Sequence, residues 1–338
     1  MAVGPGFGKR RGRFRLAGET SSLLHSEREP RCPSGLARPV GKKGKAMDLE
    51  IRTLIFVLGL LHLIQVIVFY YQYATNRGFP GVKWWLLWST AEVVGFGAML
   101  VRTVPFMLMG AILVQNAMIL LGVIFLYAGI LRFLNRRENR GLLVSLIVTY
   151  LAAQAYFLVA HDHYEARGVL VSAGLAVVAF MSARALWAYS PRAITALARF
   201  MAVTFLLHGG YHAVRAALLL GGYPAGTFFG ASPMNALAFV EAIMAGTAWT
   251  YGLIIMINQR LNAEVTESKE QIELIFNTSP DAAVITRLED GTIIKLNEAF
   301  TTQSGYSREE ARGQSTIALR VWSRPGDRQV FVKELREK

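Results

Sequence analysis

Several ionisable side chains lie inside long apolar stretches, where a charge is costly unless it serves a function. An imidazole can exchange a proton near neutral pH or ligate a metal, and a carboxylate or guanidinium can pair with a charged ligand. These residue types in an apolar setting predict a small-ligand or proton-sensing pocket. The candidates for ligand binding or sensing are His62, Glu92, His208, His212, Arg215 and Glu241.

The spacing of these residues suggests which of them act together. His208 and His212 are four residues apart and share one face of a helix, and Arg215 follows three residues later. Glu241, in the next apolar stretch, is predicted to pair with Arg215 or with a protonated His212. With His62, the two histidines also suit a metal or haem site, but no fourth ligand is evident and no metal site is assigned.

A different interpretation of the same polar side chains is purely structural. Hydrogen bonds between helices fix the packing of a membrane bundle without any ligand. Uncharged polar residues in the same apolar stretches fit this interpretation equally well; they are Gln115, Asn116, Gln154 and Asn235.

The elements that carry these residues are predicted to be membrane-spanning helices. Apolar residues make up 53% of the 338 residues and charged residues only 17%. A spanning helix needs about 20 mostly apolar residues, and most of the stretches lack the polar outer face of a soluble helix. The sequence predicts an α-helical polytopic sensor domain over 47–257, with spans near 51–71, 83–101, 107–131, 141–160, 169–188, 200–220 and 233–257.

The composition also excludes several classes of protein. A single globular enzyme is excluded by the apolar content, and a disulfide scaffold is excluded because Cys32 is the only cysteine. The net charge of +13 is concentrated in residues 1–46, which hold 11 Lys and Arg against 3 Asp and Glu. Since this excess lies outside any folded domain, we predict no nucleic acid as a partner, and the apolar stretches imply membrane lipid as a partner.

Loop charges predict the orientation of the bundle, because Lys and Arg gather on the cytoplasmic side. The breaks at 72–83, 132–140 and 184–199 are rich in these residues, whereas the alternate breaks are poor in them. An odd number of spans then places the N-terminus outside and the C-terminal segment in the cytoplasm. The predicted location is the bacterial inner membrane.

The basic segment 1–46 conflicts with this orientation, since its charges would hold the N-terminus inside. We interpret it as a disordered tail that is not translated in the natural protein. Gly41-Lys42-Lys43-Gly44-Lys45 back-translates to a purine run like a ribosome-binding site, and Met47 follows as a natural start. A tail that binds anionic lipid is the alternative.

Residues 258–276 are predicted to form a signalling helix. Apolar and small residues follow one another there at steps of four and three, as in the seam of a short parallel coiled coil. This pattern favours a homodimer, although an amphipathic helix that packs on its own domain is the alternative. The seam consists of Leu261, Val265, Ser268, Ile272 and Ile275.

The segment after this helix alternates short strands and short helices. The Ser279-Pro280 pair ends the helix, and a short apolar strand follows. Asp290-Gly291 marks a hairpin turn, and Asn297 is placed to cap the helix after the second strand. Ser307, with Glu310 three residues later, is predicted to cap another helix.

This order resembles the N-terminal half of a PAS domain, over residues 268–338. The residues that carry the resemblance are Asn277, Ser279, Pro280, Asp281, Asp290, Gly291, Asn297, Phe300, Gly305 and Tyr306. The resemblance implies an α+β fold whose sheet continues with three further strands. We therefore expect a partial PAS domain, in a fragment or a truncated reading frame.

The resemblance to PAS domains leaves the cofactor unknown, because the family binds varied ligands. Residues 261–338 contain neither histidine nor cysteine. This excludes histidine-ligated haem and the cysteinyl-flavin reaction in this part of the chain. A small organic ligand, or none, remains open.

Three short sequence segments resemble the input regions of bacterial membrane diguanylate cyclases: Met47–Leu54, Gly78–Trp85 and His212–Arg215. The chain has no Gly-Gly-Asp/Glu-Glu-Phe motif, kinase lobe or P-loop, so we predict no enzyme activity in it. We predict a sensor that relays a stimulus to a cytoplasmic PAS domain and then to an absent output domain or a partner signalling protein. Cyclic-di-GMP synthesis is favoured as output over a sensor histidine kinase. The rival interpretation is a transporter-like or metal-binding membrane protein with a degenerate soluble tail.

Overall fold

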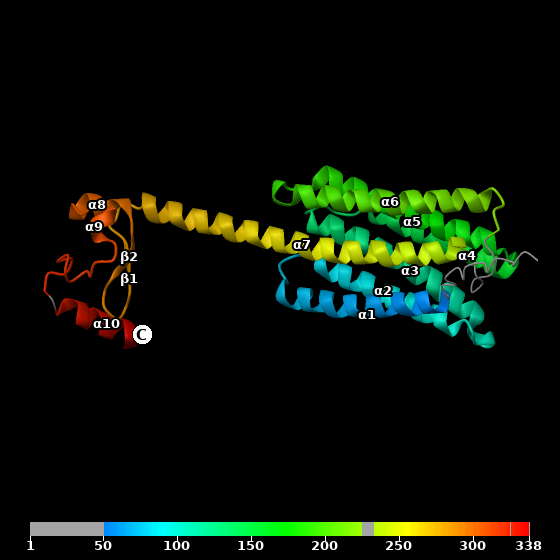
Figure 1. The fold of residues 1–338 in the computed structure, drawn as a ribbon, viewed down its shortest axis with the longest axis horizontal. Helices are drawn as coiled ribbons and strands as arrows, with labels where there is room; N and C mark the ends of the chain where they lie inside the picture. Colours follow the sequence, from blue (N-terminus) through cyan, green and yellow to red (C-terminus); the bar gives the residue numbers. More distant parts are fainter. Residues whose placement is uncertain (1–50, 225–232, 325, 338) are drawn as a thin grey trace, which may run out of the picture. The chain divides into compact units, whose positions relative to one another are not determined.

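The computed structural model describes residues 51–224, 233–324 and 326–337. In these ranges, seven helices are long and apolar enough to cross a membrane. The predicted fold class is therefore confirmed: a polytopic helical bundle, a helix that continues beyond it, and a small α+β region (Figure 1). The basic segment 1–46 and the proposed start at Met47 lie outside the described residues.

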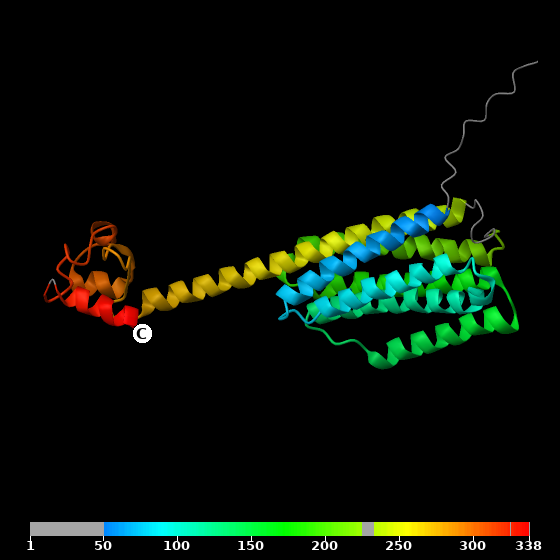
Figure 2. The same cartoon turned by 90° about the horizontal axis from the view of Figure 1, so that it is seen from below.

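The bundle is built from long helices joined by short breaks (Figure 1 and Figure 2). A 3-10 turn leads into α3 (Pro105–Met107) and another into α6 (Arg192–Ile194), and a π-helical turn (Tyr156–Ala160) extends α4. The helices are α1 (Ile51–Thr75), α2 (Val82–Val101), α3 (Leu108–Phe133), α4 (Arg140–Ala155), α5 (Tyr164–Tyr189), α6 (Thr195–Leu220) and α7 (Pro233–Thr278).

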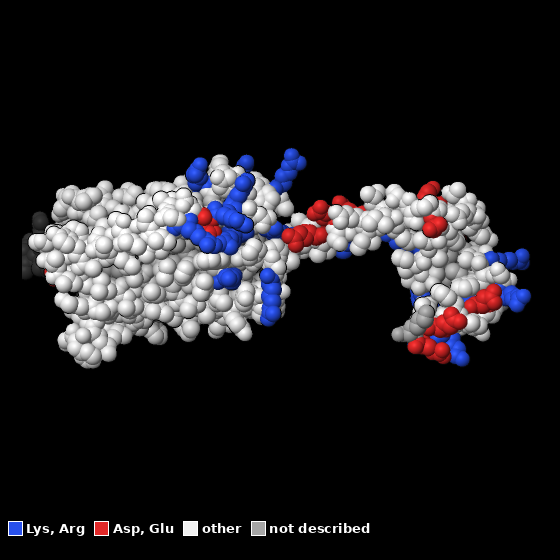
Figure 3. Space-filling view, turned by 180° about the vertical axis from the view of Figure 1, so that it is seen from behind, with Lys and Arg blue, Asp and Glu red and all other residues white. Residues whose placement is uncertain are grey.

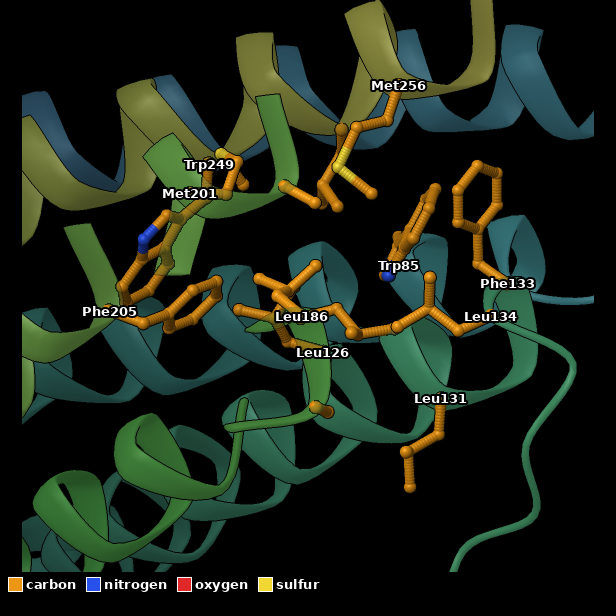
Figure 4. Close-up of a cluster of buried hydrophobic side chains, with 14 of the residues drawn as sticks. Trp85, Leu126, Leu131, Phe133, Leu134, Leu186, Met201, Phe205, Trp249 and Met256 are labelled. Carbon is orange, nitrogen blue, oxygen red and sulfur yellow. The ribbon is translucent and has the colours of Figure 1, made fainter. Parts of the chain in front are cut away.

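Large apolar side chains from α2, α3, α5, α6 and α7 form the main core of the bundle (Figure 4). The rings of Phe205 and Trp249 stack at 4.3 Å between centroids, with an angle of 10° between their planes. Trp85 and Phe133 meet at 5.3 Å. Lipid tails are as apolar as these side chains, so close packing between helices stabilises the bundle more than burial alone.

Two glycines allow α2 and α3 to approach closely. A Cβ atom on Gly129 would lie 2.4 Å from the Trp85 ring, and one on Gly81 would lie 2.5 Å from the Gly129 carbonyl oxygen. Trp85 is fully buried, so its ring has no space into which it could move. The contact between these helices therefore requires glycine at both positions.

The basic residues gather at the end of the bundle that holds the loops after α1, α3 and α5 (Figure 3). In the loop after α3, the Arg132 guanidinium donates two hydrogen bonds to Glu138 and lowers the pKa of that carboxyl to about 2. At the same end, Arg260 of α7 donates to the Phe133 carbonyl oxygen at 2.5 Å. The basic loops thus lie at one end of the bundle, and α7 is tied there to the end of α3.

Helix α7 continues without a break through the predicted boundary at 257/258. Leu261, the first residue of the predicted seam, packs against the core of the bundle. The later apolar seam residues are exposed: Val265 by 51%, Ile272 by 65% and Ile275 by 69%. The seam therefore begins inside the bundle and ends as an apolar stripe on an exposed helix.

The segment after α7 forms a two-stranded antiparallel sheet with three short helices. Strands β1 (Val284–Thr286) and β2 (Ile293–Leu296) pair with Val284 opposite Leu296. The turn between them uses Gly291 at a φ of 74°, a conformation that glycine adopts without strain. Helices α8 (Glu298–Ser304), α9 (Arg308–Ala311) and α10 (Asp327–Glu337) follow. The small core of this region contains Ile293, Leu296, Phe300 and Ala311.

Several residues of the PAS resemblance fix local turns. Asp290 accepts a hydrogen bond from the Thr292 amide at 3.0 Å, which lowers the pKa of Asp290. Ser279 Oγ accepts from the Asp281 amide just after α7 ends at Thr278, as the Ser-Pro pair predicted. The other residues of the PAS resemblance lie nearby. Asn277 is half-buried near the end of α7, and the Pro280 carbonyl accepts a hydrogen bond from Gln303. Gly305 caps α8 at a φ of 79°, and Tyr306 packs on the small core.

Asn297 joins three segments of this region. Its Oδ1 accepts from the amides of Ala283 at 2.9 Å and Phe300 at 3.0 Å, and its Nδ2 donates to the Asp281 carbonyl at 2.8 Å. The predicted helix cap is confirmed, and the same side chain also holds the start of β1. Ser307 and Glu310 form the predicted capping box of α9.

We expect Gly129→Ala to lower the free energy of unfolding by about 1–3 kcal/mol, since the added methyl overlaps the fixed Trp85 ring. Gly110→Ala, in the same helix, is the matched control because nothing lies within 4 Å of its Cβ position. Thermal unfolding of the detergent-solubilised protein measures both. Equal midpoints for the two variants would contradict the close approach of α2 and α3.

We expect Asn297→Ala to destabilise the PAS region by about 2–3 kcal/mol, because it removes a cap and leaves buried amides unpaired. Hydrogen exchange of the Ala283 and Phe300 amides in the full chain reports the loss directly. Gln303→Ala removes one exposed hydrogen bond and should change stability by less than about 0.5 kcal/mol. Unchanged exchange at both amides in the Asn297 variant would argue against this role.

Candidate functional site

A cavity of about 670 Å³ lies inside the helical bundle. Its walls come from α1, α2, α3, α5, α6 and α7, and most of its lining is apolar. This volume is in the range of pockets that hold small organic ligands. The polar side chains that line it include His62, Glu92, Gln115, Asn116, His208, His212, Arg215 and Asn235. All of the predicted sensing residues except Glu241 therefore line one cavity.

Glu241 joins this group through the histidines of α6. His208 Nδ1 lies 2.7 Å from Glu241 Oε1, and His212 Nε2 lies 3.7 Å from Glu241 Oε2. The two imidazole rings meet edge to face at 4.5 Å between centroids. Their shared helix face is the one that the spacing predicted, and Glu241 of α7 faces it.

Of the two predicted partners of Glu241, the structure brings His212 close to it, whereas Arg215 has other partners. Its guanidinium donates to Ser172 Oγ of α5 at 2.6 Å and to Asn235 Oδ1 of α7 at 3.4 Å. Glu241 pairs with the histidines, so the predicted Arg215–Glu241 pair is absent among the described contacts. Arg215 lies about one turn further along α6, where the side chains of α5 and α7 offer neutral oxygens.

Several polar atoms of this cluster have no hydrogen-bond partner in the described part of the chain. They are His208 Nε2, His212 Nδ1, Arg215 Nε and Glu241 Oε2. A buried polar group without a partner is rare, because leaving it unpaired costs free energy. The two histidines are only 6% and 5% exposed and line the cavity, so a bound ligand is the natural source of partners.

His62 and Glu92 lie in the same cavity but apart from this cluster. His62 Nδ1 bonds to the Leu58 carbonyl at 2.8 Å, and its ring packs on Phe96 at 5.2 Å. Glu92 is hydrogen-bonded to Trp88 of its own helix. The three-histidine set considered from the sequence is therefore not assembled, and Glu241 takes the third place instead.

A further polar group on the cavity wall was not predicted. It consists of Arg102, Tyr164 and Arg167. The Arg167 guanidinium donates to the Phe157 carbonyl at 2.7 Å and pairs with Asp162. These residues fall at predicted span ends, where basic side chains are ordinary. Their convergence depends on which helix ends meet in space.

The uncharged polar residues behave as the structural interpretation requires. Asn116 Nδ2 donates to Gln154 Oε1 at 3.0 Å, and Gln154 Nε2 donates to the Arg167 carbonyl at 3.2 Å. Tyr150 donates to the Asn116 carbonyl at 3.2 Å. This chain of bonds ties α3 and α4 to α5 and holds one wall of the cavity in place.

Comparison with known proteins identifies one region of the chain. Residues 270–337 match the family model described as the PAS fold. A PAS domain is therefore present there, in agreement with the resemblance carried by its motifs. No curated protein and no solved structure is significantly similar to the chain. Together with seven membrane-capable helices, the PAS domain fits a signal-sensing role in a multi-pass membrane protein.

The cavity can be tested by its access to water. In a Cys32→Ser background the chain has no cysteine, so a single new thiol reports on its surroundings. We expect Ala238→Cys, at the cavity wall, to react with a small permeant methanethiosulfonate, because only a hydrated thiol ionises. Ala198→Cys, at a fully buried core position, is the control and should stay unmodified. Equal protection of both thiols would show that the cavity is closed to water.

Proposed function

We propose that this protein is a membrane signal sensor in which occupancy of the bundle cavity is relayed to the PAS region through α7. The observation that carries this proposal is the continuity of α7, which runs as one helix from Pro233 to Thr278. The same helix supplies cavity-wall residues and ends beside the sheet of the PAS region. A movement of α7 at the cavity would therefore also move the end of α7 that lies beside the sheet.

Both ends of this helix make contacts that suit a relay. Near its start, Asn235 and Trp249 line the cavity and Glu241 contacts the histidines of α6. Near its end, Glu273 accepts a hydrogen bond from Lys295 of β2 at 2.9 Å, and the Lys295 ammonium lies over the Phe276 ring. A rotation or axial shift of α7 would alter both sets of contacts.

The ligand must bind the two positions of α7 with different affinities, since only a differential affinity shifts an equilibrium. The contacts of Glu241 provide such a difference. They join α7 to α6 at a buried point, so a ligand that breaks or bridges them favours one arrangement of these helices. The unpaired atoms of the cluster are the groups that such a ligand would engage.

In this proposal the protein is a homodimer, and α7 transmits the signal in both copies. The exposed apolar stripe formed by Val265, Ile272 and Ile275 supports this, because the stripe follows the spacing of a parallel coiled coil. A partner helix would cover side chains that are otherwise half to two-thirds exposed. Rotation of α7 would then change the register of the pair and the spacing of two PAS regions.

We place the protein in the bacterial inner membrane, with the PAS region in the cytoplasm. The gathering of Lys and Arg at the loops beside Arg260 supports this orientation, because positive charges stay on the cytoplasmic side. Arg102 and Arg167 line the cavity at the ends of α2 and α5 that lie opposite these loops, so this part of its wall would face the periplasm, and the proposed stimulus is a molecule or ion from outside.

The chain senses and relays in this proposal, and an output enzyme does the chemistry. That enzyme is joined to the PAS region in a longer natural chain, or it binds as a partner protein. Cyclic-di-GMP synthesis is our preferred output, supported by the resemblance of the Gly78–Trp85 turn and the His212–Arg215 phrase to input regions of membrane diguanylate cyclases. A sensor histidine kinase is the second candidate.

The dimeric relay predicts a specific cross-link. In a Cys32→Ser background, Ile272→Cys should form an intermolecular disulfide in membranes under mild oxidation, because the two seam positions face each other. Glu270→Cys, on the opposite face of the same helix, is the matched control and should cross-link far less. Equal yields at both positions, or none at Ile272→Cys, would contradict the seam.

A further inference from the structure

The cluster on α6 and α7 has the geometry of a metal coordination site. His208, His212 and Glu241 each offer one ligand atom, and these atoms all lie within 4.8 Å of one another. Ligands about 2.1 Å from a tetrahedral ion lie roughly 3.4 Å apart. Side-chain movements of about an ångström would therefore bring all three onto one ion, without a change in the helices.

The chemistry of the three side chains narrows the kind of ion. Two imidazoles and one carboxylate suit Zn²⁺ and its transition-metal neighbours, whereas Mg²⁺ and Ca²⁺ prefer oxygen alone. The spacing of four residues between the histidines directs both rings to one side of α6. The carboxylate comes from α7 and brings a negative charge that offsets part of the charge of the ion.

A second observation points to a ligand at this place. His208 Nε2, His212 Nδ1 and Glu241 Oε2 are buried without a hydrogen-bond partner among the described residues. A purely structural hydrogen bond between His208 and Glu241 would use one atom of each and would leave the other three unexplained. Coordination through the atoms that face one another, His208 Nδ1, His212 Nε2 and a Glu241 carboxylate oxygen, would engage Glu241 and leave the other two ring nitrogens to a second ligand in the cavity.

We propose that His208, His212 and Glu241 bind a divalent transition-metal ion that bridges α6 and α7. This inference deepens the proposed function, because the ion would occupy the sensing cavity and hold the relay helix. Three protein ligands leave at least one coordination position open, and the two histidines line the cavity. A small molecule in the cavity can therefore be the fourth ligand.

The test uses the full chain, purified in detergent without a polyhistidine tag and stripped of metal. Titration with Co²⁺ should give visible d–d absorption with one ion bound per chain, and Zn²⁺ should displace it. Glu241→Gln keeps the size of the side chain and should weaken Co²⁺ binding by at least about tenfold, as should His208→Ala. His62→Ala is the matched control, because His62 lies in the same cavity outside the cluster.

The outcomes separate this site from the proposed relay. Absence of the Co²⁺ absorption in folded wild-type protein would overturn the metal site, as would equal affinity in the Glu241→Gln variant. Either result would still be consistent with the proposed function, in which the cavity binds a ligand other than a metal ion. Tight Co²⁺ binding with an Ile272→Cys cross-link that does not respond to the ion would keep the site and contradict the relay. Thermal midpoints confirm that the variants remain folded.

Discussion

The architecture follows from the rule that a membrane span must satisfy its backbone polar groups within the protein. This rule makes every span a helix and drives polar side chains toward the interior of the bundle. The pairing of buried His208 with partly buried Glu241 is one consequence, since neither group can face lipid at low cost. The cavity is lined by several of these polar side chains, whereas α2 and α3 pack closely at Gly129.

Much of the fold could be predicted from the sequence, because length and apolar content decide whether a helix can span. The local signals of the PAS region were equally direct, since the caps at Asn297 and Ser307 depend on residues only three positions away. The span ends and the continuity of α7 were harder. Arg260 does not end the helix, because its guanidinium reaches the Phe133 carbonyl while its stem stays among apolar rings.

The candidate site could be predicted only in part. The shared face of His208 and His212 follows from helical geometry, and the proximity of Glu241 follows from its place in the next span. The choice between Arg215 and the histidines as partners of Glu241 depends on how α6 and α7 are rotated, which no local pattern encodes. The same reason explains why His62 lies apart from the cluster and why Arg102 and Arg167 could not be predicted to line the cavity.

Transmission from the cavity to the PAS region cannot rest on the contact at its far end alone. Glu273 and Lys295 are both exposed to solvent, so water and salt screen their ion pair and it contributes little. The stiffness of a continuous helix and the apolar stripe on it are stronger means of coupling. A ligand that bridges α6 and α7 near Glu241 would act where the surroundings are apolar and charges interact strongly. The position of α7 is therefore best controlled at the cavity and best read out at the seam.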